Sequence, residues 1–288
     1  MNLPSGRGRR LPLVSLVSVA CAGVLLLCSP AQASTPLPGR ESAMSTQVTG
    51  EPPSGTETDT PMGSQIRKHE GGGDDPLLTP VVDPLATVAG MDVSGHQGNV
   101  DWNSWWGQGM RFAYVKATEG TGYKNPYFAQ QYNGSYNVGM IRGSYHFALP
   151  DRSSGAAQAN YFVDNGGGWS KDGKTLPGAL DMEYNPYGST CYGKTKSGMT
   201  AWIKDFSDTY HARTGRWPVI YTSTSWWNQC VDGDFSSTNP LWVARYASTV
   251  GQLPYKWGIW TIWQYTSSPL DKNTFNGAYD RLQALANG

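Results

Sequence analysis

The sequence is poor in the residues that most often bind metals or act as nucleophiles. It has four cysteines and four histidines among 288 residues. It contains no His-x-x-x-His pair and no cysteine cluster, so the pattern gives no support to a zinc site. The Gly-x-Ser-x-Gly elbow of serine hydrolases is also missing. We therefore expect no metal and no other cofactor, and any catalysis must come from other side chains.

Aromatic residues are missing from the first 90 positions. All 35 Phe, Tyr and Trp residues follow Met91. Residues 34–88 are instead rich in Pro, Gly, Ser, Thr and acidic residues, and such a composition buries too little apolar surface to offset the entropy of ordering. The sequence predicts a disordered linker or pro-segment over 34–88. It predicts one folded domain over 89–288, a size that one hydrophobic core can support.

Long hydrophobic runs are also missing, apart from one between Leu11 and Leu27. Three arginines precede this run, and the small-x-small pattern Ala31-Gln32-Ala33 follows it, as in a secretory signal peptide. The run is about 17 residues long, near the short limit for crossing a bilayer. We expect a signal peptide over 1–33, a secreted protein that could associate with a cell wall, and no stable membrane insertion.

Neither sign of charge is in excess. The chain has 22 Lys and Arg and 22 Asp and Glu, and from Ala89 onward the counts are 16 and 14. Nucleic-acid binding needs a concentrated basic face, which this balance argues against. We expect no nucleic-acid partner, and we expect the protein to be a monomer.

Removal of the signal peptide leaves two cysteines, Cys191 and Cys230. An even pair in a secreted protein predicts a disulfide. It would close a loop of roughly 40 residues, which the chain-entropy model values at about 4 kcal/mol. Reactive thiols are the alternative.

Short β-branched and aromatic runs predict seven strands, with an eighth near Leu270. Helical patterns lie between the early strands, and the clearest, 198–213, has one apolar stripe. This alternation is typical of parallel strands with crossover helices. We predict an α/β fold: a single distorted, TIM-like β/α barrel with about eight strands and fewer helices, which are lost in the second half. A doubly wound open sheet is the alternative. The seven strands are expected at 89–93, 112–117, 140–147, 178–183, 219–223, 241–245 and 259–264.

The stretch "ALDMEYN", residues 179–185, ends an apolar run with two carboxylates. On a strand, Asp181 and Glu183 would share one face with Cα atoms about 6.6 Å apart. Two such acids repel, so one tends to keep its proton near neutral pH while the other stays charged. A solvated loop with two ordinary surface acids is the alternative.

Polar side chains follow the other predicted strands in the same way. A barrel would gather them at one rim, where the strands end. Acids beside aromatic rings suit a sugar polymer, because rings stack on pyranoses and a pair of acids can cleave the acetal bond. For His146 we expect a packed, hydrogen-bonded role rather than metal ligation. The rim set is Asp92, Ser94, His96, Gln97, Lys116, Glu119, Tyr145, His146, Tyr221, Arg245, Tyr246, Gln264 and Asp271.

A series of motifs over nearly all of residues 89–288 resembles glycoside hydrolase family 25, the Chalaropsis-type lysozymes. The resemblance implies a distorted β/α barrel and β-1,4-N-acetylmuramidase activity on bacterial peptidoglycan, with tolerance of O-acetylated muramic acid in some members. Two further readings stay open: a wall-glycan-binding protein without activity, and an endo-N-acetylglucosaminidase or chitinase-like hydrolase. The motifs are "GMDVSGHQGNVDW", "FAYVKATEGTGY", "IRGSYHFA", "LPGALDMEYNP", "VIYTS", "LWVARY", "IWQYTSS" and "LDKNTFNG".

The resemblance also implies roles for individual residues. Glu183 is similar to the general acid, Asp181 to the residue that orients its neighbours, and Asp92 and Asp271 to further carboxylates of the centre. It implies substrate-assisted retention by the acetamido group, while a carboxylate nucleophile or an inverting water would reassign Asp181 and Asp92. The expected substrate-binding residues are Lys116, Tyr123, Tyr145, Tyr221 and, from the rim, Gln264.

Overall fold

A computed structural model of the chain describes residues 58–83 and 86–288, which belong to one compact unit. The predicted signal peptide and residues 34–57 of the predicted linker lie outside the described residues. None of the described helices is both long enough and apolar enough to cross a bilayer.

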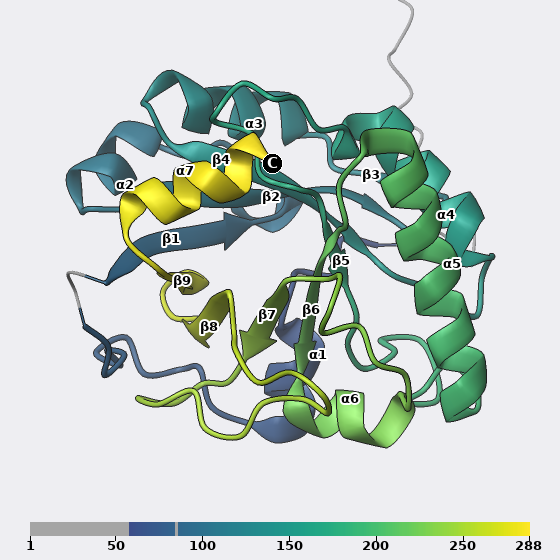
Figure 1. The fold of residues 1–288 in the computed structure, drawn as a ribbon. Helices are drawn as coiled ribbons and strands as arrows, with labels where there is room; N and C mark the ends of the chain where they lie inside the picture. Colours follow the sequence, from purple (N-terminus) through teal and green to yellow (C-terminus); the bar gives the residue numbers. More distant parts are fainter. Residues whose placement is uncertain (1–57, 84–85) are drawn as a thin grey trace, which may run out of the picture. The chain divides into compact units, whose positions relative to one another are not determined.

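Eight strands form a closed barrel (Figure 1). Closure comes from parallel pairing of β1 with β2, so the predicted barrel is confirmed and the open-sheet alternative is wrong. The last strand, β9, runs antiparallel to both of its neighbours, β8 and β1. The two-residue strand β3 (Tyr123–Lys124) folds back on β2 outside the ring. The barrel strands are β1 (Thr87–Val93), β2 (Phe112–Glu119), β4 (Ile141–Phe147), β5 (Ala179–Asp181), β6 (Val219–Ser223), β7 (Leu241–Ala244), β8 (Ile262–Thr266) and β9 (Lys272–Asn276).

Helices surround the first half of the barrel and thin out in the second, as predicted. Between Leu241 and Asn276, all of it described, no helix separates β7, β8 and β9. Helix α5 buries the predicted apolar stripe against the barrel, and the side chain of Thr195 caps its first turn. The sequence patterns did not predict α2, η1, η2 and α7. The elements are η1 (Gly95–Gln97), α2 (Trp102–Gly107), α3 (Phe128–Asn137), α4 (Gly155–Phe162), η2 (Val163–Gly167), α5 (Lys196–Thr214), α6 (Thr224–Cys230) and α7 (Tyr279–Asn287).

The segment before the barrel is folded where the structure describes it, so the expected disorder is wrong for residues 58–83, while the alternative of a pro-segment over 34–88 stays a prediction. Helix α1 (Ser64–Glu70) packs on the barrel. Met62 and Ile66 are each 1% exposed and join the barrel core, and full burial of such a side chain contributes roughly 1.5–3 kcal/mol. The segment orders because the barrel supplies the apolar surface that its own composition lacks. The first barrel strand also begins at Thr87, two residues before the predicted boundary.

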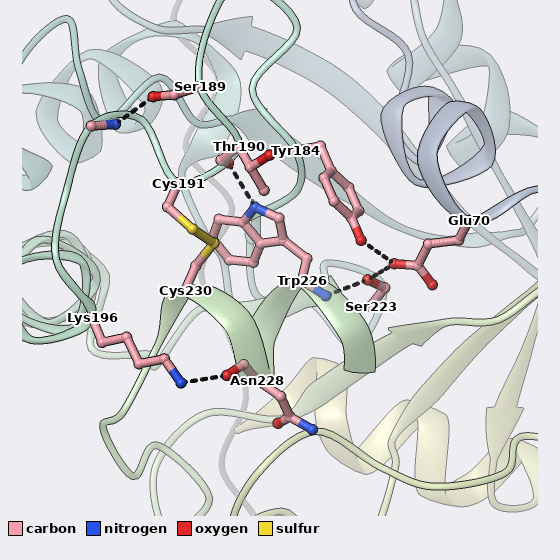
Figure 2. Close-up of a disulfide and its surroundings, with 11 residues drawn as sticks. Glu70, Tyr184, Ser189, Thr190, Cys191, Lys196, Ser223, Trp226, Asn228 and Cys230 are labelled. Carbon is pink, nitrogen blue, oxygen red and sulfur yellow. Dashed lines mark hydrogen bonds between the residues drawn. A yellow bond between two sulfur atoms is a disulfide. The ribbon is translucent and has the colours of Figure 1, made fainter.

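The predicted disulfide between Cys191 and Cys230 is present (Figure 2). Their Cα atoms are 5.5 Å apart, well inside the range that a disulfide can bridge. The bond joins the loop before α5 to the last residue of α6, so it fixes two connections that follow neighbouring strands β5 and β6.

Candidate active site

Asp181 and Glu183 stand at the carboxyl end of β5. The strand ends at Asp181, and Glu183 follows two residues later; both are fully buried. Burial raises the pKa of Asp181 well above its ordinary value, and the charge of Glu183 adds to this rise. Burial also raises the pKa of Glu183 to about 8, against three backbone N–H donors that lower it. Burial thus raises the pKa of both acids, and repulsion adds to the rise only at Asp181, whereas the sequence predicted that one of the two would stay charged.

Asp92 and Asp271 lie next to each other at another part of the same mouth, where β1 ends and β9 begins. Because β9 is antiparallel, its first residues lie beside the end of β1, and the Asp92 N–H donates to the Asp271 carbonyl at 3.2 Å. Burial raises the pKa of Asp92 to about 7. Burial, followed by the charge of Asp92, raises the pKa of Asp271 well above its ordinary value.

Two amides hold the Asp92 carboxylate. Its Oδ2 accepts from Gln264 Nε2 at 2.9 Å and from Asn273 Nδ2 at 2.7 Å. Gln264 was predicted at this rim, but Asn273 was missed. The only sequence signal for Asn273 was its place two residues after Asp271. This position becomes informative only once β9 is known to run antiparallel to β8 and to pair Asn273 with Gln264.

The predicted tyrosines line the same mouth. Tyr221 donates to Gln264 Oε1 at 2.7 Å, and the Tyr246 hydroxyl lies 3.0 Å from the same oxygen. Gln264 thus connects two phenols to the Asp92 carboxylate. Tyr145 is buried on β4, and its hydroxyl accepts from the Met62 N–H at 3.3 Å.

Lys116 is at the mouth but is committed to an ion pair. Its buried Nζ lies 2.5 Å from Glu119 Oε2 and 3.1 Å from Asp59 Oδ1. It also donates to the Thr60 carbonyl at 2.7 Å and lies 5.0 Å from the Tyr123 ring. A substrate contact by this ammonium would have to replace the two contacts made by residues 59 and 60.

Several rim residues have structural roles instead. His146 is buried between Thr118 and Gln158, with ring nitrogens 2.8 and 2.9 Å from their side chains. Burial lowers the pKa of His146 to about 3, so the ring is neutral, and the predicted packed role is confirmed.

Other predicted rim residues turn away from the acids. Ser94 and Gln97 cap η1 reciprocally, and Arg245 donates to the Val250 carbonyl in its own loop. His96, in η1, is exposed and lines the cleft. In the part of the chain that the structure describes, no group of three or more His, Cys, Asp or Glu side chains is suited to hold a metal.

The N-terminal segment reaches the acids directly. Glu183 Oε1 accepts from the Gly63 N–H at 2.7 Å, and Oε2 accepts from Gln65 and Ile66 at 2.9 and 3.0 Å. Both oxygens of this carboxylate are therefore occupied by the chain itself. A cleft of about 470 Å³ remains beside the segment. Its lining includes Asp59, Gly63, Arg67, His96, Ser267 and Asp271.

Comparison with known proteins places this geometry in a family. The chain is 43% identical to Lysozyme M1 of Streptomyces globisporus, over 98% of this chain and 96% of the relative. It is 48% identical to the N,O-diacetylmuramidase of Chalaropsis sp, over 70% of this chain and 100% of the relative. The solved muramidase from Acremonium alcalophilum superposes with a TM-score of 0.69 at 57% identity, over 70% of this chain and 99% of that one. The sequence model of glycosyl hydrolases family 25 matches residues 91–273, and the chain belongs to this family.

Proposed function

We propose that this glycoside hydrolase is a secreted lysozyme that cleaves the β-1,4 bond between N-acetylmuramic acid and N-acetylglucosamine in peptidoglycan. The observation that carries the proposal is the group of four buried acids at the barrel mouth, none of them in an ion pair within the described residues. Secretion rests on the predicted signal peptide. The four acids come from one chain, which supports action as a monomer.

Glu183 is the proposed general acid and base. A proton donor for a glycosidic oxygen must keep its proton near neutral pH, and burial raises the pKa of Glu183 to about 8. In the first step the carboxyl gives its proton to the leaving oxygen as the C1–O bond breaks. In the second step the resulting carboxylate takes a proton from the water that attacks C1.

Asp181 is the proposed partner of the substrate's acetamido group. Both of its carboxylate oxygens are buried and have no hydrogen-bond donor among the described residues, which leaves them free to accept from an N–H of the substrate. Held in this way, the acetamido oxygen can bond to C1 as the leaving oxygen departs, which stabilises the positive charge that develops there. This bond breaks again when water attacks C1 in the second step. Asp92 and Asp271 would add two further acids at the same centre, each with a pKa raised by burial.

The tyrosines and Gln264 form the proposed sugar-contacting wall. Tyr145, Tyr221 and Gln264 surround the acids, and each has a polar atom at the mouth. Lys116 and Tyr123 lie farther along the same side, where Lys116 fixes the position of Glu119. These residues would orient successive sugars, and a pure binding protein would not need the acids beside them.

The identity of the new chain end tests the proposed bond. The solved muramidase from Acremonium alcalophilum covers 70% of this chain over 99% of its own length. Residues 87–288 are 202 of the 288 residues, which is the same share. A barrel of this length therefore folds without the preceding segment in that relative, and residues 87–288 are a suitable sample. Purified peptidoglycan is digested with this barrel, and the products are reduced and analysed by mass spectrometry. We expect muramic acid at the new reducing ends. Glucosamine there would indicate glucosaminidase specificity, and intact glycan would support the binding-protein alternative.

A further inference from the structure

The segment 59–73 crosses the barrel mouth from the β2 side to the β8 side. It enters beside Lys116, where Asp59 lies 3.1 Å from the ammonium. Thr60 donates from its N–H and its hydroxyl to Glu119, at 3.0 and 3.1 Å. The first residues of the segment thus complete a buried ion pair that belongs to the barrel.

Gly63 sits among the groups expected to bind sugar. Its carbonyl lies 3.0 Å from the Tyr246 hydroxyl, and its N–H donates to Glu183. A Cβ placed on Gly63 would lie 2.2 Å from the Tyr246 hydroxyl and 2.6 Å from the polar atoms of Gln264 and Tyr221. Its φ of +77° is also one that L side chains rarely adopt. Only glycine fits this position.

Helix α1 continues across the mouth toward β6. Ile66 is buried in the barrel core, and Glu70 accepts hydrogen bonds from Tyr184 and Ser223, as Figure 2 shows. The ring of His69 stacks on Tyr184 with centroids 4.3 Å apart. The helix is therefore held by apolar, polar and aromatic contacts at the ends of two different strands.

The segment leaves through Gly73. Its carbonyl accepts from the Ser267 N–H and hydroxyl, at 3.2 and 3.1 Å, and lies 3.2 Å from the Thr266 hydroxyl. The chain beyond it is open to solvent, because Leu77 is 84% exposed and Val81 is 74% exposed. Docked residues are thus followed by an accessible stretch before the barrel begins.

This arrangement covers the whole acid group. Asp271 is the most exposed of the four acids at 8%, and the other three are at most 1% exposed. A glycan chain has no access to these carboxylates while residues 59–73 are in place. The Chalaropsis and Acremonium muramidases, matched over only 70% of this chain, are about as long as the barrel alone, whereas the Streptomyces relative is matched over 98%.

We propose that residues 59–73 are an autoinhibitory pro-segment that fills the glycan site, and that an extracellular endoprotease activates the enzyme by hydrolysing a peptide bond within residues 74–83. The proposal rests on the proposed function. While the segment is tethered, its effective concentration at the mouth is in the millimolar range. After the cut it must bind at its own, far lower concentration, so a dilute enzyme loses it.

Controlled cleavage of the intact chain tests the activation step. The chain is treated with a protease that cuts beside leucine, and mass spectrometry confirms a cut within 74–83. At nanomolar enzyme, we expect release of reducing ends from purified peptidoglycan to rise at least tenfold. The matched control is the L77G/L78G/L85G variant, which lacks all leucines between the segment and the barrel and should stay at the low rate after the same treatment. Less than a twofold rise in the cleaved chain would overturn the proposal.

Two glycine variants test the docking without any cut. Gly63→Ala and Gly215→Ala place a Cβ at almost the same backbone conformation, φ and ψ of +77° and −8° against +74° and +5°. Only the first Cβ meets atoms of the mouth, and nothing lies within 4 Å of a Cβ on Gly215, which lies outside the segment. Both variants carry a similar backbone strain, so a difference between them reports what the change does at the mouth. We expect the intact Gly63→Ala chain to be several-fold more active than intact Gly215→Ala. Equal rates would contradict docking at Gly63.

Failure of the proposed function would look different. In that case neither the intact nor the cleaved chain releases reducing ends. Binding of soluble peptidoglycan fragments, followed by tryptophan fluorescence, then decides the inhibitory role by itself. At least tenfold tighter binding after cleavage supports a segment that blocks the glycan site, and equal binding before and after cleavage overturns it.

Discussion

Two groups of acids at the barrel mouth differ in whether a cation neutralises them. On the β2 side, Glu119 and Asp59 share the ammonium of Lys116. At the ends of β1 and β5 and before the start of β9, four buried acids have no ion pair within the described residues, and burial raises the pKa of each. A paired acid is an anchor whose charge is neutralised locally. An unpaired buried acid keeps a proton that chemistry can use.

Removing the proposed proton donor should have the largest effect. In the barrel 87–288, Glu183→Gln keeps the shape of the side chain but removes its titratable proton, so we expect kcat to fall by roughly 10²–10⁴-fold with glycan binding retained. Initial rates and binding of soluble peptidoglycan fragments measure the two quantities. Glu119→Gln, which changes an acid that is paired with Lys116, is the matched control and should change kcat by less than about tenfold. Full activity in Glu183→Gln would show that the unpaired acids, like the paired ones, are not needed for catalysis.

Breaking the ion pair should instead affect stability. In the intact chain, Lys116→Met leaves the buried Glu119 and the half-buried Asp59 without their cation. Breaking a buried pair in this way typically costs about 3–5 kcal/mol, which lowers Tm by roughly 10 °C in a domain of this size. Lys204→Met is the control, because Lys204 pairs with Asp208 at 2.5 Å on the surface, where such a pair contributes about 0–1 kcal/mol. Equal Tm values for the two variants in calorimetry would show that the buried ion pair stabilises the fold no more than the surface pair does.

The pH dependence of stability should reveal the raised pKa values of the unpaired acids. The folded chain holds protons on Asp92 and Glu183, whose pKa values are about 7 and about 8, whereas the unfolded chain releases them above about 4.5. Stability should therefore fall as pH rises from about 5 to 8. We expect a drop in Tm on the order of 10–20 °C, and a smaller one in Asp92→Asn. A Tm that rises over this interval would contradict the assignment of raised pKa values.

The barrel was predictable from the sequence because its signals are local. Each strand is a short apolar run, and polar residues at its end point to the mouth. The "ALDMEYN" stretch by itself indicates the acid pair, although β5 ends at Asp181 and Glu183 lies beyond it.

The rest depended on contacts between distant parts of the chain. Segment 59–73 has no aromatic residue and gains its order from the barrel, which its composition cannot show. Asn273 became visible only through the antiparallel register of β9. Lys116 was predicted as a sugar contact, but its partner Asp59 lies in a stretch that was expected to be disordered.

Titration of the Glu183 carboxyl tests the central claim most directly. The intact chain, labelled with ¹³C at its Glu side-chain carboxyls, is followed by NMR from pH 3 to 10, and the Glu183→Gln spectrum identifies the resonance by its loss. We predict a midpoint near 8, well above that of an ordinary glutamate. A midpoint at or below about 4.5 would show a carboxyl that holds no proton at neutral pH, and would contradict the raised pKa on which its proposed role as the acid rests.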